Sequence, residues 1–129
     1  MKSQQRADGP VRWEWTPEWM QGADEGDVEQ ALDRMPLSEG QLSLLRALYE
    51  AGEAGLWMDE LAAATARSPR QVVGVLGGLG NRVNRTAGYP RRRGPGISLL
   101  IHWRCVGREW HYRLLPMTRR VLERLGHVG

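Results

Sequence analysis

The stretch from Ser68 to Arg93 reads SPRQVVGVLGGLGNRVNRTAGYPRRR and decides the fold. Ser68 can cap a helix, Pro69 suits the first helical position, and Gln71 completes a capping box. We therefore predict a helix over residues 69–85. One stripe of this helix is apolar and suits a core: Val72, Val75, Leu76, Leu79 and Val83. The opposite stripe is small, polar or basic: Arg70, Gly74, Gly77, Asn81 and Arg85.

Four glycines lie within the predicted helix, at positions 74, 77, 78 and 80. Each interior glycine costs about 0.5–1 kcal/mol relative to alanine, so tertiary packing must offset them. Small residues on the outer stripe would let the helix backbone approach a DNA strand closely. Alternatively, Gly77 and Gly78 let the helix pack tightly against a neighbour, or they break it. The sequence leaves these alternatives open.

Four other helices are predicted from their caps and their apolar periodicity. An acidic helix spans residues 24–35, a capping box at 38–41 opens the next, a short Ala-rich helix covers 58–65, and a terminal helix follows Pro116. The apolar stripes are Val28, Ala31, Leu32 and Met35 in the first, Leu42, Leu45, Leu48 and Tyr49 in the second, and Val121, Leu122 and Leu125 in the last. Residues 38–85 thus predict a three-helix core.

Residues 97–115 change to a period of two, which predicts a β-hairpin. A two-residue loop at Gly107-Arg108 fits a type II′ turn. The resulting register pairs Val106 with Glu109, Cys105 with Trp110, Trp103 with Tyr112 and Ile101 with Leu114. Both apolar rows then share one face, so we expect Trp103 and Trp110 to be buried. His102 and His111 are expected on the outer face.

The charge is divided between the two halves of the chain. Residues 1–60 hold 5 basic and 13 acidic residues, whereas residues 61–129 hold 13 basic, all arginine, and 2 acidic. No acidic residue lies between Arg67 and Arg108. Arginine suits bidentate contact with phosphates and guanine edges, so the basic half indicates nucleic acid. The alternative is that two oppositely charged surfaces attract each other within one fold.

The order of helix, helix, basic helix, hairpin and closing helix resembles the winged helix-turn-helix superfamily over residues 38–126. The segments that carry the resemblance are LSEGQLSLLRALYEAG, LWMDELAAATARSPRQVVGVLGGLGNRV and ISLLIHWRCVGREWHYRLL. The resemblance implies an α+β, mostly α fold with a three-helix core, a two-stranded wing and a closing C-terminal helix, after a Trp-rich N-terminal extension. It implies a DNA-binding protein that acts as a transcriptional regulator, although the superfamily also includes protein-interaction modules.

The candidate DNA contacts form two groups. Asn can pair with adenine and Arg with guanine in the major groove, where the predicted helix 69–85 would lie. The helix contacts are Arg70, Gln71, Gly74 and Asn81. Phosphate contacts are expected from the helix exit, the Arg-rich loop and the wing: Arg82, Asn84, Arg85, Arg91, Arg92, Arg93, Arg104 and Arg108.

Residues outside the predicted winged helix suggest other contacts. We expect residues 1–11 to be disordered, residues 12–36 to pack on or extend the domain, and residues 37–129 to form it. Trp13, Trp15 and Trp19, with the acidic helix, suggest a protein partner or a homodimer. A second alternative is a reader of modified DNA, with Trp103, Trp110 or Tyr89 stacking on a flipped base. The expected burial of the two wing tryptophans disfavours it.

Several function classes have no support in the sequence. One cysteine, Cys105, and the absence of a signal peptide or long apolar run favour a cytoplasmic protein with no membrane partner. His102, His111 and Cys105 do not have the spacing of a zinc site, so we expect no metal and no cofactor. No nucleophile elbow or phosphate-binding glycine loop is present, and we expect no enzyme activity.

Overall fold

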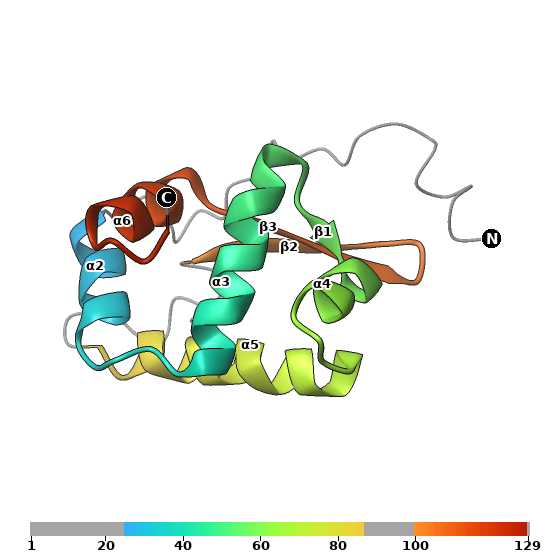
Figure 1. The fold of residues 1–129 in the computed structure, drawn as a ribbon, viewed down its shortest axis with the longest axis horizontal. Helices are drawn as coiled ribbons and strands as arrows, with labels where there is room; N and C mark the ends of the chain where they lie inside the picture. Colours follow the sequence, from blue (N-terminus) through green and yellow to red (C-terminus); the bar gives the residue numbers. More distant parts are fainter. Residues whose placement is uncertain (1–24, 87–99, 129) are drawn as a thin grey trace.

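The structure, a computed structural model, describes residues 25–86 and 100–128. Its elements there are α2 (Glu25–Asp33), α3 (Glu39–Ala51), the 3-10 turn η2 (Gly52–Ala54), β1 (Leu56–Trp57), α4 (Met58–Ala64), α5 (Pro69–Asn84), β2 (Ile101–Val106), β3 (Glu109–Leu114) and α6 (Pro116–Arg124). This is the mostly helical α+β fold predicted from the sequence, and it is compatible with a winged helix (Figure 1). The predictions for residues 1–24 and for Tyr89 and Arg91, Arg92 and Arg93 lie outside the described residues.

The helix starts follow the capping residues. Ser38 Oγ accepts the Gln41 N–H at 3.1 Å, and the Gln41 side chain accepts the Ser38 N–H at 3.2 Å, which confirms the first capping box. The same pair of bonds joins Ser68 and Gln71 at the start of α5. Each box satisfies backbone donors that a helix start leaves without a partner inside the helix.

Helix α5 is continuous through all four glycines, so the alternative of a broken helix is excluded. The turn before it is closed by Ala66, whose φ of 54° is in the left-handed region, and by a bond from the Arg67 N–H to the Ala62 carbonyl at 2.9 Å. In Figure 1, α5 lies along the lower edge of the molecule, with α3 rising from it and α4 near its beginning. This arrangement turns one side of α5 away from the rest of the protein.

The hairpin forms in the predicted register. Strand β2 pairs antiparallel with β3, and all four predicted pairs are observed, including Trp103 with Tyr112. A third strand, β1, was not predicted; it adds to β3 by pairing Leu56 with Tyr112 and Trp57 with His111. Two residues are too short to show an alternating pattern, so the sequence carries no signal for this strand.

One core joins all the helices to the base of the sheet. The predicted stripes of α2, α5 and α6 supply it, with Leu79 and Val83 of α5 fully buried. The Thr118 hydroxyl and the Leu115 N–H both donate to the Leu100 carbonyl, which ties α6 to the start of the hairpin. Helix α2 packs against α5 and α6, so the acidic helix belongs to the same core as the predicted winged helix.

Two core predictions are corrected. Met35 is 56% exposed instead of lying in the core, because α2 ends at Asp33 and its helical stripe ends with it. Leu44 was left out of the predicted stripe of α3 but is buried, since both sides of that helix are covered by other elements.

The hairpin faces also differ from the prediction. Trp103 and Trp110 are 38% and 40% exposed, although the register that was expected to bury them is present. On that face Ile101 and Tyr112 are buried in the core. Trp110 lies nearer the turn, and Trp103, although paired with Tyr112, lies on the edge strand β2. His111 was expected outside but is 3% exposed, because its ring packs edge-on against Trp57 of the unpredicted strand at 4.7 Å. Among the described residues, no helix has the length and apolar character needed to cross a membrane.

Candidate nucleic-acid interface

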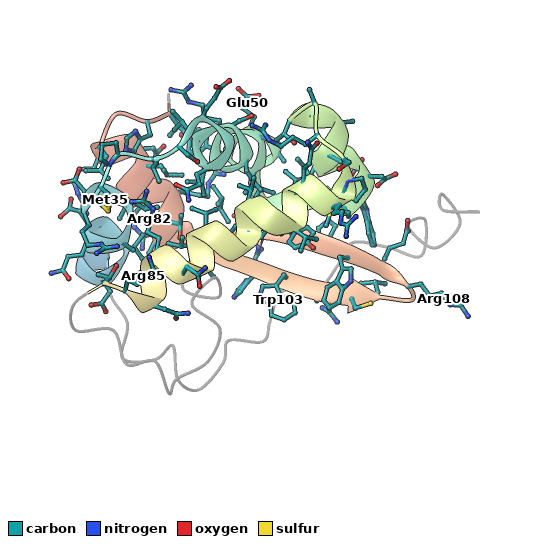
Figure 2. The ribbon with its side chains drawn as sticks, turned by 90° about the horizontal axis from the view of Figure 1, so that it is seen from below. Met35, Glu50, Arg82, Arg85, Trp103 and Arg108 are labelled. Atoms are coloured by element: carbon teal, nitrogen blue, oxygen red, sulfur yellow. The ribbon has the colours of Figure 1, made fainter. Side chains whose placement is uncertain are left out.

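The outer stripe of α5 is exposed along its whole length. Its members were predicted to face away from the core, and the structure leaves all five exposed: Arg70, Gly74, Gly77, Asn81 and Arg85. Val73, beside them, is 57% exposed. Figure 2 looks at the molecule from the side of α5, with Arg85 at the end of that helix and Arg108 at the tip of the hairpin. Arg85 of the helix and Arg108 of the hairpin are therefore both seen from this side.

The glycines of α5 have different surroundings. A Cβ atom placed on Gly74 or Gly77 would meet nothing within 4 Å, so close packing against a neighbouring helix does not explain these two residues. A Cβ on Gly78 would lie 3.3 Å from Gln41 Nε2, and Gly80 is buried. The glycines at 78 and 80 thus serve packing, whereas those at 74 and 77 leave a bare strip of backbone open to solvent.

Polar side chains border this bare strip. Arg70 lies before it, and Asn81 and Arg85 lie after it, all of them exposed. Gln71 is also exposed, but its Oε1 is used in the capping box, where it accepts the Ser68 N–H at 2.9 Å, which leaves its amide NH₂ for a ligand. Asn84 is half-buried and its Oδ1 is shielded from solvent, so it is a poorer candidate than Asn81.

Arg82 is not part of this surface, which corrects the prediction that it contacts phosphate. Its guanidinium donates to the carbonyls of Met35 at 2.7 Å and Pro36 at 2.9 Å, and to Gln41 Oε1 at 3.1 Å (Figure 2). A longer bond of 3.4 Å reaches the Ala31 carbonyl. Partial burial lowers the pKa of this arginine. Arg82 therefore binds the end of α2 to α5, a contact that depends on a neighbour far away in sequence.

The wing offers two further exposed arginines. Gly107 has a φ of 65°, which the tight turn needs and which glycine adopts without strain. Arg108 follows it at the hairpin tip, and Arg104 lies on β2, opposite His111 in the register. Both side chains are therefore carried by the two-stranded ribbon of β2 and β3.

Other arginines of the basic half are used inside the protein. Arg120 binds Glu25, and Arg124 binds Glu25 and Glu29 at 3.0 Å, which joins α6 to α2. The hydrogen bonds from Arg120 and Arg124 hold the pKa of Glu25 below its usual value. Here the two oppositely charged halves attract each other within one fold, as the alternative explanation proposes. That explanation does not extend to the outer stripe of α5.

His102 of the hairpin is partly buried beside Arg113. Burial, and then the nearby charge of Arg113, lowers the pKa of His102 to about 4. Arg113 Nη2 lies 3.1 Å from His102 Nδ1. Within residues 25–86 and 100–128, no three His, Cys, Asp or Glu side chains are grouped so that they could hold a metal ion.

Sequence reasoning recognised most of this surface but missed part of it. The helical periodicity was sufficient to find the outer stripe of α5, and the turn glycine was sufficient to find Arg108. The exposure of Trp103 and Trp110 was missed. Alternation shows that two rings share a face, but it does not show how far the core extends beneath them. No family model, no characterised protein and no solved structure matches this chain.

Proposed function

We propose that this protein binds double-stranded DNA as a transcriptional regulator, with a winged helix-turn-helix fold. Helix α5 enters the major groove, and the wing contacts the phosphate backbone. The observation that carries the proposal is the exposed stripe of α5, where a bare strip at Gly74 and Gly77 lies between Arg70 at one end and Asn81 and Arg85 at the other.

The shape of the stripe supports insertion into a groove. With no side chain at Gly74 and Gly77, the helix axis can come nearer to the bases than an ordinary helix face allows. Val73 supplies an apolar contact of the kind that fits a thymine methyl group. Arg70 and Asn81 are the two candidates for base contact, because their side chains form paired hydrogen bonds with guanine and adenine.

The distribution of charge supports backbone contacts. Arg85, Arg104 and Arg108 are exposed, Figure 2 shows Arg85 and Arg108 from the side of α5, and the predicted contacts at Arg91, Arg92 and Arg93 would add to them. Contacts of this kind give affinity that falls as salt rises and little choice of sequence. Because few side chains on α5 can read bases, we expect modest sequence selectivity. The Arg-rich loop remains a prediction from the sequence.

The competing proposal is a protein-interaction module. An exposed valine at position 73, in the middle of an otherwise polar stripe, would suit an apolar partner. This alternative predicts no binding to DNA at low salt. It also predicts that loss of the arginines around the stripe has little effect on the contact.

The test is a fluorescence-anisotropy titration of mixed-sequence duplex at two salt concentrations. The double variant Arg85→Ala with Arg108→Ala should weaken binding roughly tenfold on every sequence and reduce the salt slope by about two. The matched control is Arg120→Ala with Arg124→Ala, which removes the same charge from α6 and should leave affinity nearly unchanged. No measurable binding of the native protein at low salt would overturn the proposal. Equal losses in both double variants would show that net charge alone attracts the DNA.

A further inference from the structure

Two large aromatic rings are partly open to solvent on one face of the wing. Trp103 lies on β2 and Trp110 on β3, 38% and 40% exposed, with ring centroids 5.4 Å apart and planes inclined at 47°. Contact between the two rings stabilises the hairpin, as aromatic cross-strand neighbours do. The surface that they leave open is apolar and aromatic, which is typical of a contact site.

The fold gives a reason for the exposure. Ile101 and Tyr112 lie on the same face of the hairpin and are buried, so the core covers that part of the face. Trp110 lies nearer to the turn. Trp103 pairs with Tyr112, but β2 is the edge strand of the sheet, whereas β3 lies between β1 and β2, so Trp103 has a strand on one side only. In Figure 2, which views the molecule from the side of α5, Trp103 is seen on the hairpin. A ligand held by α5 and the wing would therefore have the indole rings within its reach.

The surroundings of the rings are positively charged. Arg108 lies at the tip of the same hairpin, two residues before Trp110, and Arg85 ends α5; both are seen in the view from the side of α5 (Figure 2). The acidic residue nearest in sequence is the partly buried Glu109. Aromatic rings among cations are the combination that binds unpaired nucleobases, since the bases stack on the rings while the cations hold the phosphates.

We propose that Trp103 and Trp110 bind an unpaired base of DNA that α5 and the arginines hold by its duplex. The proposal rests on the proposed function and adds a preference for DNA with an unstacked base. A second copy of this chain is a less suitable occupant. A symmetric dimer through this patch would place the same positively charged side, with Arg85 and Arg108, of both copies in the contact, and like charges oppose it.

The test compares two labelled probes, a fully paired duplex and the same duplex with one unpaired thymine in its centre. We expect the native protein to bind the second probe about tenfold more tightly, because stacking on a ring adds to the shared phosphate contacts. Trp103→Leu with Trp110→Leu should bring this ratio close to one. Because both probes are measured on the same sample, a loss of folded protein cancels in the ratio.

Two further variants keep the result interpretable. Trp103→Phe with Trp110→Phe retains aromatic rings and should retain part of the preference, even if the leucine variant does not fold. Arg108→Ala, the matched control, should weaken binding to both probes by the same factor.

Four outcomes would contradict the inference in distinguishable ways. Equal binding of both probes would overturn it but leave the proposed function standing. A preference that survives the double leucine change would show that other residues recognise the unpaired base. A concentration-dependent dimer that the leucine variant abolishes, seen by sedimentation, would identify the patch as a contact between copies. Absence of binding to either probe would overturn this inference and the proposed function together.

Discussion

The side of the molecule where α2 and α6 meet and the side formed by α5 and the wing use arginine in opposite ways. Arg82 and Arg85 show the contrast most directly, since they are three residues apart on the same helix. The guanidinium of Arg82 donates to carbonyls at the end of α2, whereas Arg85 is exposed at the end of α5. Similarly, Arg120 and Arg124 bind acidic residues of α2, while Arg108 is exposed at the tip of the hairpin.

The difference shows that the arginines of the basic half do not form a single surface. Part of this charge holds the acidic helix in place, and part of it is exposed to solvent. Arg82 satisfies backbone carbonyls at a helix end, a demand that recurs wherever a helix end lies inside a fold. Exposed ion pairs contribute little to stability, so Arg82, more than Arg120 or Arg124, should differ from the exposed arginines in mutational tests.

The largest expected effect is a difference in the free energy of unfolding between Arg82→Ala and Arg85→Ala. Arg82→Ala removes the donors for carbonyls at the end of α2 and should lower the free energy of unfolding by about 2–3 kcal/mol. Arg85→Ala should change it by less than about 0.5 kcal/mol, as exposed substitutions usually do. Urea unfolding followed by circular dichroism measures both. Equal losses would mean that the internal and exposed arginines do not differ.

A conservative change tests the geometry of the same contact. Arg82→Lys keeps the charge but replaces the planar fork by a single ammonium group. We expect it to recover only part of the stability lost in Arg82→Ala, because one ammonium cannot match the separate directions of Met35, Pro36 and Gln41. Full recovery would show that charge, not the number of hydrogen bonds, is what matters there.

A second prediction concerns His102, which an internal arginine contacts within the wing. Its pKa is lowered to about 4, mainly by burial, against 6.5 in an unfolded chain. The folded state therefore binds fewer protons than the unfolded state between these two values. Above pH 6.5 His102 is neutral in both states, and its titration does not reduce the free energy of unfolding. This free energy should fall as the pH drops from about 6.5 to 4, by about 2 kcal/mol once partial solvent exposure is considered.

The measurement is the urea midpoint at pH 7.5 and at pH 4.5, for the native protein and for His102→Gln. Glutamine cannot titrate, but its carbonyl oxygen can still accept a bond from Arg113. The variant should lose less stability on acidification than the native protein, and the difference between the two isolates His102 from the carboxylates. An identical pH dependence in both would contradict the prediction.

The sequence predicts the elements of this fold better than the limits of its surfaces. Capping residues place the starts of α3 and α5, and the alternation of the hairpin fixes its register to the residue. Both signals are local, so one sequence is enough to find them. The inward turn of Arg82 and the burial of His111 depend on α2 and β1, which lie far away in the chain. The openness of Trp103 depends in the same way on where the core ends.

The smallest expected effect tests whether the bare strip of α5 serves binding. Gly74→Ala should raise the free energy of unfolding by about 0.5–1 kcal/mol, because a Cβ there meets nothing within 4 Å and alanine favours the helix. Gly78→Ala, the control, should gain less, since its Cβ would press on Gln41, whose side chain also accepts a bond from Arg82. If the strip lies against DNA, Gly74→Ala should be more stable and yet bind duplex more weakly. A more stable variant with unchanged affinity would mean that the backbone at Gly74 does not approach the ligand.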